Sequence, residues 1–190
     1  MTRKYELKRR AERQAETRDR IVQATVDLHT TVGPARTSVS AIAERAGVQR
    51  HTVYAHFPGE RELFVACTAH WSKDHPFPDP ARWLAIESPE LRLGAALHDV
   101  YAWYEQVEAD VAIFQRDAQV HDLTAERVAL RNESMAASAR ALAQGWPRRK
   151  AVRAAIGHAL EFETWRSLVR RQGLSEAQAV EAMRRLVSSA

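Results

Sequence analysis

Apolar residues recur at helical spacing along almost the whole chain, and glycine and proline fall between the periodic segments. No stretch alternates with the two-residue period of a half-buried strand, and no internal repeat is visible. The pattern therefore predicts an all-α protein. The expected helices cover about 17–31, 39–45, 49–55, 60–73, 89–107, 109–118, 123–144, 148–172 and 175–188.

Two segments interrupt this pattern and divide the chain. Residues 1–16 are polar without a sustained apolar face, which predicts a flexible arm or a frayed helical extension. Residues 74–90 hold four of the seven prolines and favour a hinge or loop. We expect a basic arm at 1–16, a small three-helix domain at 17–64 and a helical bundle at 65–190.

The charge is unevenly distributed over these parts. The first 70 residues carry twelve Lys and Arg against eight Asp and Glu, whereas the remainder carries sixteen of each. The net charge of +4 therefore belongs to the N-terminal third. A basic head on a neutral body indicates a polyanion as partner, although a merely solvated basic surface gives the same count.

Several classes of function lack any signal in the sequence. The single cysteine, Cys67, excludes an intramolecular disulfide and a multi-cysteine zinc site. The histidines are scattered, and there is no nucleophile elbow, P-loop or GxGxxG, so we expect no metal, no cofactor and no enzyme activity. No apolar run approaches the ~18 residues of a membrane span. The N-terminus has no apolar signal region, so we expect a cytoplasmic protein without a membrane partner.

Residues 37–64, TSVSAIAERAGVQRHTVYAHFPGERELF, have the pattern of a helix-turn-helix motif. Thr37 or Ser38 is suited to cap the first short helix, and Gly47 stands where the chain must turn sharply. Gln49 opens the second helix, in which Val53 and Tyr54 are expected to pack inward while Arg50, His51 and Thr52 point outward. In such a motif the second helix enters the major groove of DNA with its N-terminal residues at the base edges.

With this motif the sequence resembles the TetR family of transcriptional regulators. The matching words are TRDRIVQATVDLHTTVG, TSVSAIAERAGV, QRHTVYAHF and PGERELF, within residues 17–64, and beyond them the match is architectural. The resemblance implies a DNA-binding domain at 17–64 and a ligand-binding and dimerisation domain at 65–190. It also implies a homodimeric repressor that a small, mainly apolar effector releases from a palindromic double-stranded DNA operator. The alternatives are an accessory DNA-binding protein with an effector-free structural body and, more remotely, a helical enzyme whose hairpin mimics the motif.

The resemblance also implies which side chains contact DNA. Thr37 and Ser38 match positions that contact phosphate, and pure capping is the alternative role for both. Arg50 is a candidate for guanine or for a phosphate. The whole set of candidate DNA-binding residues is Thr37, Ser38, Gln49, Arg50, His51, Thr52, Tyr54 and His56.

One position departs from the family pattern. The family usually carries a phosphate-binding lysine three residues after the Phe that corresponds to Phe57. Here that position is Glu60, which would repel phosphate, with Arg61 beside it. Either Arg61 replaces the contact or the contact is lost.

The N-terminal arm is a second candidate for contact with nucleic acid. Basic arms either follow the DNA backbone or enter a minor groove. Three glutamates, Glu6, Glu12 and Glu16, dilute the charge, so a solvated tail is the alternative. The basic residues of the arm are Arg3, Lys4, Lys8, Arg9, Arg10 and Arg13.

The body carries candidates for effector binding and for dimerisation. Large aromatic side chains with polar tips suit an apolar pocket, but an ordinary bundle core has the same pattern. The effector candidates are Leu97, Tyr101, Trp103, Tyr104, Phe114, Phe162 and Trp165. The helices expected at 123–144 and 148–172 are the predicted dimer pair, and burial within one subunit is the alternative. The dimer candidates are Val152, Ile156, Ala159 and Leu160.

Overall fold

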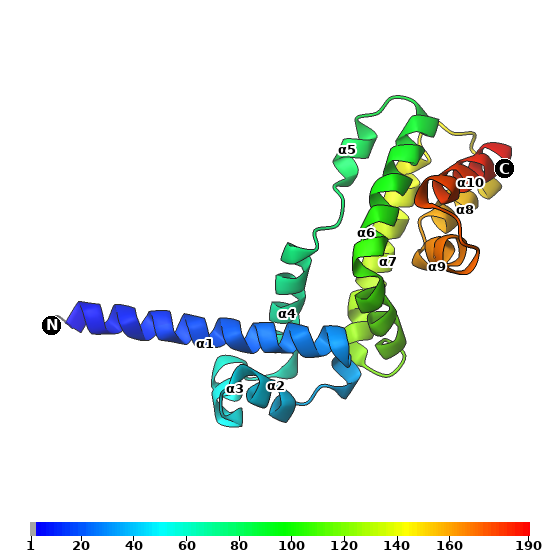
Figure 1. Ribbon diagram of the computed structural model, residues 1–190. Helices are drawn as coiled ribbons and strands as arrows, with labels where there is room; N and C mark the ends of the chain where they lie inside the picture. The colour runs from blue at the N-terminus through cyan, green and yellow to red at the C-terminus, as the bar shows by residue number, and fades with distance from the viewer. Residues whose placement is uncertain (1–2) are drawn as a thin grey trace. The chain divides into compact units, whose positions relative to one another are not determined.

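The computed structural model describes residues 3–190, with side-chain surroundings from residue 5 onward (Figure 1). Every regular element in this range is helical, which confirms the all-α prediction. The α-helices are α1 (Arg3–Thr31), α2 (Val39–Ala46), α3 (Arg50–His56), α4 (Glu60–Asp74), α5 (Pro80–Leu84), α6 (Pro89–Asp117), α7 (Asp122–Leu142), α8 (Lys150–Ala159), α9 (Phe162–Arg166) and α10 (Glu176–Ser189). Two short helical turns are η1 (Pro34–Arg36) and η2 (Ser167–Arg171).

The N-terminal arm is helical and continuous with α1, which begins at Arg3 rather than near residue 17. The start of this helix was predicted from its apolar face, and residues 3–16 have no such face. Its residues are instead good helix formers such as Ala, Glu, Arg and Lys, and Lys8 pairs with Glu12 one turn later at 3.8 Å. A helix that is already nucleated by packing further along the chain extends at low cost through such residues.

The body differs from the expected helices in two places. The proline-rich segment contains α5, in which Asp79 caps the first turn and Pro80 occupies the first helical position. The segments expected at 89–107 and 109–118 make up α6, and the break expected between them is confirmed by a kink at Val107, which leaves helical geometry (φ −116°, ψ 15°). The single helix expected over 148–172 is wrong. Glu161 adopts an extended conformation (φ −73°, ψ 142°) that ends α8 and starts α9.

The chain divides into two compact units. The N-terminal unit holds the described residues up to Pro76 together with Ala109–Glu126, and the C-terminal unit holds Phe77–Glu108 together with Arg127–Ala190. The N-terminal unit thus extends past residue 64 and includes a segment that the sequence pattern assigned to the body. The Val107 irregularity in α6 lies immediately before one of the crossings between the units.

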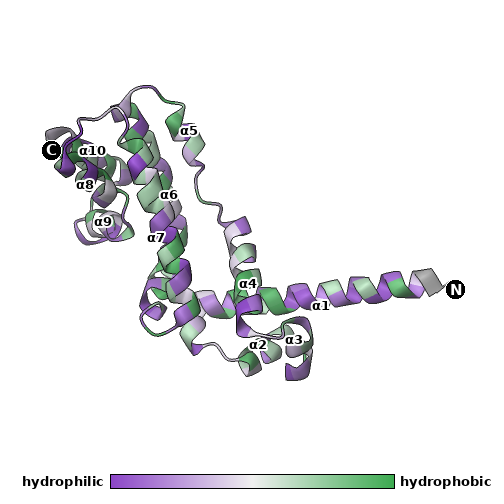
Figure 2. Ribbon diagram, turned by 180° about the vertical axis from the view of Figure 1, so that it is seen from behind, coloured by the Kyte–Doolittle hydropathy of each residue, from purple (hydrophilic) through white to green (hydrophobic). Residues whose placement is uncertain are grey.

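The core of the N-terminal unit is formed where α2 and α4 pack on the C-terminal half of α1 and α3 packs on α2. Figure 2 shows hydrophobic colour gathered where α1 meets α4 and mostly hydrophilic colour along the N-terminal part of α1. Gly47 ends α2 in the left-handed conformation (φ 65°), where a side chain would be strained. The buried core residues are Ile21, Val22, Ala24, Ile42, Ala43, Ala46, Val53, Phe57, Leu63 and Cys67.

The segment that leads into α2 is held by the end of α6, which belongs to the same unit. Asp117 accepts a hydrogen bond from the Ala35 N–H at 2.9 Å and pairs with Arg116 at 2.7 Å. Arg116 also donates to the Val32 carbonyl at 2.8 Å. Gly33 has a φ of 101° and faces Asp117 so closely that an added Cβ would collide with the carboxylate. These contacts fix the chain just before the first helix of the motif.

The core of the C-terminal unit combines aromatic packing with hydrogen bonds from ring hydroxyls. Tyr101 donates to the Ala159 carbonyl and Tyr104 donates to the Leu160 carbonyl, each at 2.8 Å. These bonds satisfy carbonyls at the end of α8, where the helix stops. The Trp83 indole donates to Asp99 at 2.8 Å and attaches α5 to α6.

His29 is a half-buried titratable group beside the core of the N-terminal unit. Its Nδ1 lies 3.4 Å from the Cys67 Sγ, and its ring lies 5.9 Å from that of Phe64. Burial is the main cause that lowers the pKa of His29 to about 4, and His121 adds to it, while Glu60 and Asp117 act in the opposite sense. Burial raises the pKa of Cys67 to about 12, so a neutral thiol faces a neutral imidazole.

We expect the N-terminal unit to lose stability as the pH falls from about 6.5 to about 4. In that window the unfolded chain protonates His29 and the folded chain does not, so protons favour unfolding. A shift from 6.5 to about 4 corresponds to roughly 3 kcal/mol at about 1.4 kcal/mol per pKa unit. Urea unfolding at a series of pH values measures this effect. His29→Leu should flatten the dependence, whereas the same change at the exposed His51 should leave it intact. Parallel curves for wild type and His29→Leu would contradict the assignment.

Candidate nucleic-acid interface

The start of α2 is capped by Ser38. Its Oγ accepts a hydrogen bond from the Ala41 N–H at 3.2 Å, and its backbone is extended, as an N-cap requires. The Thr37 hydroxyl donates to the Gly33 carbonyl at 2.8 Å. Ser38 is exposed and Thr37 is half-buried, so the Ser38 hydroxyl combines its capping role with access from solvent.

Helix α3 has an inner face that is buried and an outer face that is open. Val53 is 1% exposed and Phe57, which ends the helix, is 3% exposed. Their burial fixes the rotation of this seven-residue helix about its axis. The candidate residues on α3 are consequently outside the core: Gln49, Arg50, His51 and Tyr54 are exposed, and Thr52 and His56 are half-buried. The inward packing expected for Tyr54 is therefore wrong: Val53 takes the buried position, and Tyr54 is 47% exposed.

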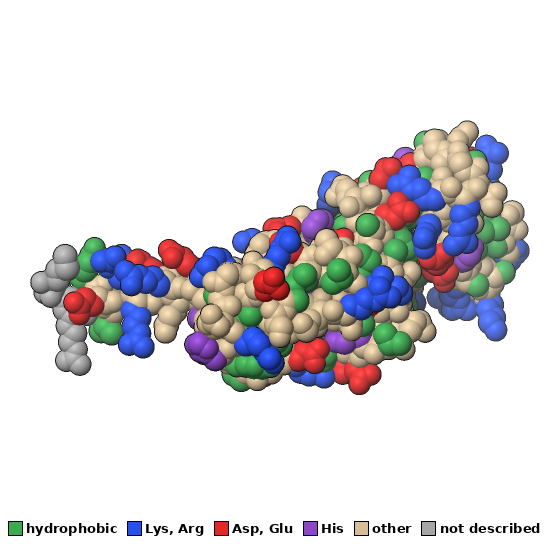
Figure 3. Space-filling view, turned by 60° about the horizontal axis from the view of Figure 1, so that its bottom comes forward, with side chains coloured by type: hydrophobic (Ala, Val, Ile, Leu, Met, Phe, Trp, Pro, Cys, Tyr) green, Lys and Arg blue, Asp and Glu red, His purple; other side chains and the backbone are tan. Residues whose placement is uncertain are grey.

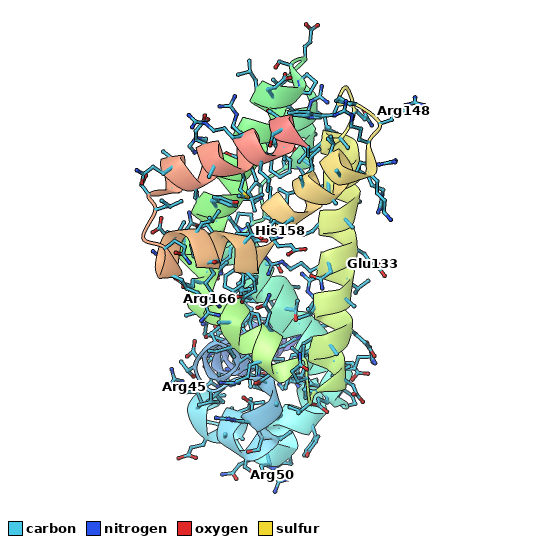
Figure 4. All side chains as sticks on the ribbon, turned by 90° about the vertical axis from the view of Figure 1, so that its right-hand side faces the viewer. Arg45, Arg50, Glu133, Arg148, His158 and Arg166 are labelled. Carbon is cyan, nitrogen blue, oxygen red and sulfur yellow. The ribbon has the colours of Figure 1, made fainter. Side chains whose placement is uncertain are left out.

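Arg50 is the first residue of α3, and its side chain points away from the helices of its unit (Figure 4). Among the described residues it forms no ion pair, and no acidic residue occupies the first turn of α3. The guanidinium is therefore free to meet an anion or a base edge.

Other arginines of the same unit are occupied in holding it together. Arg45 pairs with Asp27 at 2.7 Å, Arg20 donates to the Ala46 carbonyl at 3.3 Å, and Arg18 lies 4.8 Å above the Phe57 ring. These contacts join α1 to α2 and to the end of α3. Some basic residues of the N-terminal unit thus hold its helices together, whereas others, such as Arg50, are free to contact a ligand.

Glu60, which departs from the family pattern, and its neighbour Arg61 both interact with other side chains of the unit. The Glu60 carboxylate lies 3.0 Å from His121 Nε2. Arg61 makes a two-pronged contact with Glu126 at 2.7 and 3.0 Å, and this contact lowers the pKa of Glu126. Arg61 could therefore reach a phosphate only by leaving Glu126.

The effector candidates fall into both units. Phe114 belongs to the N-terminal unit, where its ring lies 5.7 Å from that of Trp71 in an edge-on arrangement. The other candidates are buried in the C-terminal unit, and the rings of Trp103, Tyr104, Phe162 and Trp165 contact one another with centroids 5.2–5.8 Å apart. Both tyrosine hydroxyls are used by backbone carbonyls. This packing is that of a core, and effector contact remains a prediction for all of them.

Arg131 is a member of this aromatic cluster that sequence reasoning missed. Its guanidinium lies 4.4 Å above the Trp103 ring and 5.6 Å from the Tyr104 ring. Burial lowers its pKa, and no carboxylate in the described chain forms an ion pair with it. Periodicity places Arg131 on a helix but cannot show that it stacks on rings from a segment about thirty residues earlier.

The dimer candidates are covered within the single chain. Val152 and Leu160 are 2% exposed, and Ile156 and Ala159 are fully buried. They pack inside the C-terminal unit, where α8 contacts α10. Burial within one subunit, the alternative that the sequence left open, accounts for the low exposure of these side chains, and their contact with a second subunit stays a prediction.

The described residues contain neither a membrane-spanning helix nor a metal site. No helix there is both long and apolar enough to cross a membrane. Nor do three or more His, Cys, Asp or Glu side chains in that part come together as ligands for a metal ion.

An open, cationic second helix on a small buried core, reached through a glycine turn, defines a helix-turn-helix DNA-binding protein. The family model described as "Bacterial regulatory proteins, tetR family" matches residues 21–67. The regulator SrpR of Pseudomonas putida is 34% identical over 102 residues, which are 53% of this chain and 47% of SrpR. The uncharacterized regulator TtgW, also of Pseudomonas putida, is 34% identical over 102 residues, which are 75% of TtgW. The chain belongs to the TetR family, and it spans about half the length of SrpR.

Solved structures share the fold over nearly the full chain. A TetR-like regulator from Rhodococcus sp. RHA1 has a TM-score of 0.63 at 18% identity and covers 90% of this chain and 93% of its own. The multidrug binding protein EbrR, crystallised with imidazole, has a TM-score of 0.56 at 21% identity over 90% of this chain and 89% of its own. At this level of identity the likeness concerns the fold.

We expect two substitutions at Ser38 to separate capping from DNA contact. Ser38→Ala removes the cap and should lower the unfolding free energy by about 1 kcal/mol. Ser38→Asp keeps a cap but adds a negative charge, so it should fold normally and bind DNA much more weakly. Urea unfolding and DNA titration measure the two effects. Ser175→Asp, at the N-cap of α10, is the matched control and should leave DNA binding unchanged. Normal DNA affinity in Ser38→Asp would show that Ser38 only caps.

Proposed function

We propose that this protein is a sequence-specific repressor that binds a palindromic operator as a homodimer and leaves it when a small effector binds the body. The observation that carries the DNA-binding part is the free outer face of α3, led by Arg50, on a helix whose rotation is fixed by Val53 and Phe57. Family membership supports the role in transcription. We further expect the protein to act in the cytoplasm.

In this proposal the residues at the start of α3 read bases and the flanking residues position the helix. Arg50 would donate to guanine O6 and N7, with His51 and Thr52 on the same turn. Gln49, Tyr54 and His56 on α3 would join Thr37 and Ser38 at the start of α2 on backbone phosphates. A two-fold symmetric dimer would place two such helices in successive major grooves.

The effector part of the proposal rests on the aromatic cluster of the C-terminal unit. A mainly apolar compound would lie among rings such as Trp103 and Phe162, and Arg131 would receive a negatively charged group if the compound has one. That the multidrug binding protein EbrR, which shares this fold, was crystallised with imidazole supports the binding of a small molecule. The effector releases DNA only to the extent that it binds the DNA-incompetent state more tightly.

One observation favours the alternative, an accessory DNA-binding protein with an effector-free body. The ring hydroxyls of Tyr101 and Tyr104 are satisfied by backbone carbonyls, and the rings around them are closely packed. A ligand in this cluster would find no free tyrosine hydroxyl to hydrogen-bond with. The two proposals share the DNA-binding face and differ in whether any small molecule changes DNA affinity.

We expect Arg50→Ala to relax the preference at one base pair of each half-site, at a cost of roughly 1–3 kcal/mol. Tyr54→Phe should instead weaken binding to all sequences about equally, because phosphate contacts carry no sequence information. The operator is first selected from random DNA with purified protein, and competition against single-base variants then gives the preferences. Arg45→Ala, at a residue that lies apart from Arg50 (Figure 4), is the control for loss of one positive charge, and its melting temperature is measured alongside because Arg45 pairs with Asp27. A base preference that Arg50→Ala leaves unchanged would remove its readout role.

We expect a cognate effector to bind about 5–150-fold more weakly when operator DNA is saturating, because linkage is reciprocal. Compounds that raise the melting temperature are titrated by tryptophan fluorescence with and without operator. Trp103→Phe should lower effector affinity and leave DNA affinity intact, and Trp165→Phe tests the neighbouring ring in the same way. Identical effector affinity with and without operator would replace the sensor by the accessory DNA-binding protein.

A further inference from the structure

The N-terminal part of α1 and the recognition helix α3 flank an open hollow of about 470 Å³. Thr52 and His56 of α3 line one side, so the hollow is continuous with the proposed DNA-binding face. The other side is formed by successive turns of α1 that lie before the packed part of that helix. The lining residues are Glu6, Arg9, Arg10, Arg13, Gln14, Thr17, Thr52 and His56.

The α1 residues of the hollow form a stripe along one face of the helix. With about 3.6 residues per turn, side chains three or four positions apart lie on the same face. Glu6, Arg10, Arg13 and Thr17 follow this spacing, and Arg9 lies beside them. The ion pair between Lys8 and Glu12 falls on the opposite face. The arm therefore presents its arginines to the hollow and a neutral pair to the other side.

The chemistry of the hollow suits phosphate groups. It brings three guanidinium groups together with two threonine hydroxyls and one imidazole, against the single carboxylate of Glu6. Within the part of the chain that the structure describes, Arg9, Arg10 and Arg13 form no ion pair, and Arg9 only lies 5.8 Å from the Tyr5 ring. Figure 3 shows the blue side chains along this part of α1, with red ones between them. The side chains of Arg3 and Lys4, two further basic residues of the arm, lie outside the described ones.

The helical form of the arm decides between the two ways in which a basic arm meets DNA. An α-helix with side chains is about 10–12 Å wide, whereas the minor groove is about 6 Å wide. A helix of that width does not enter the minor groove, and the major groove is taken by α3 in the proposed function. The arm is therefore left to the sugar–phosphate backbone beside that groove.

We propose that this hollow receives the DNA backbone that borders the major groove occupied by α3, with Arg9, Arg10 and Arg13 contacting its phosphates. This inference rests on the proposed entry of α3 into the groove. It adds to the head a set of contacts that are independent of sequence, and it lengthens the region of DNA that each subunit covers.

Two single substitutions on the same arm test the proposal. Arg13→Gln and Lys8→Gln each remove one positive charge, but only Arg13 faces the hollow. DNA affinity is measured over a series of salt concentrations, on the selected operator and on a duplex of random sequence. Arg13→Gln should weaken binding several-fold on both and reduce the slope of log affinity against log salt by about 0.9, the value for one lost phosphate contact. Lys8→Gln should keep the wild-type slope.

Arg13→Lys and melting temperatures complete the test. The lysine variant keeps the charge and should recover most of the slope, and all three variants should melt like wild type because the positions are exposed. Equal slopes for Arg13→Gln and Lys8→Gln, with selective binding by wild type, would overturn the hollow as a backbone site and leave the proposed function intact. If wild type shows no preference for any selected duplex, the repressor proposal fails, while a slope difference on the random duplex would still support the arm.

Discussion

The burial of one face of the short helix α3 is the constraint on which the DNA-binding surface depends. A seven-residue helix is too short to be stable alone in water, so α3 persists because Val53 and Phe57 are buried against α1 and its neighbours. That burial sets the rotation of the helix and leaves its opposite face to solvent. Arg50 and His51 are exposed as a consequence. A loss of apolar packing at Val53 would therefore disorder the reading face while leaving its residues unchanged.

The N-terminal unit is completed by polar contacts from a distant segment, Ala109–Glu126. Asp117 fixes the chain before α2, His121 meets Glu60, and the Trp71 indole donates to Asp110 at 2.6 Å. Burial alone would raise the pKa of Asp117, but hydrogen bonds from Arg116 and from the Ala35 N–H lower it, so the carboxylate stays charged. The DNA-binding unit consequently includes the C-terminal part of α6, a helix that begins in the C-terminal unit and enters the DNA-binding unit just after Val107 leaves helical geometry. A change in α6 has a direct physical route to the start of α2.

The sequence predicted what depends on local pattern and missed what depends on distant partners. The glycine turn at Gly47 and the two short helices of the motif follow from spacing and are confirmed. The choice between a flexible arm and a helical extension of α1 stayed open because the first turns of α1 are stable through propensity rather than an apolar face, and the structure shows the helical extension. The end of α8 was missed because Tyr101 and Tyr104, more than fifty residues earlier, satisfy the carbonyls that end it. The role of Arg61 stayed open because its partner, Glu126, lies 65 residues away.

Contacts with distant residues also decide which of the basic side chains in the N-terminal third can bind a ligand. A count of charges treats all its Lys and Arg alike, but the structure assigns several of them to internal contacts, on a ring, a carbonyl or a carboxylate. Those occupied residues are Arg18, Arg20, Arg45 and Arg61. Besides these, Arg9, Arg10, Arg13, Arg36 and Arg50 form no ion pair in the described part of this third. Thr52 and His56 of α3 line the same hollow as the arginines of the arm. In the proposed complex the DNA backbone meets arginines set in a row along the arm, and such a row fits the linear charge of a DNA backbone better than a compact anion.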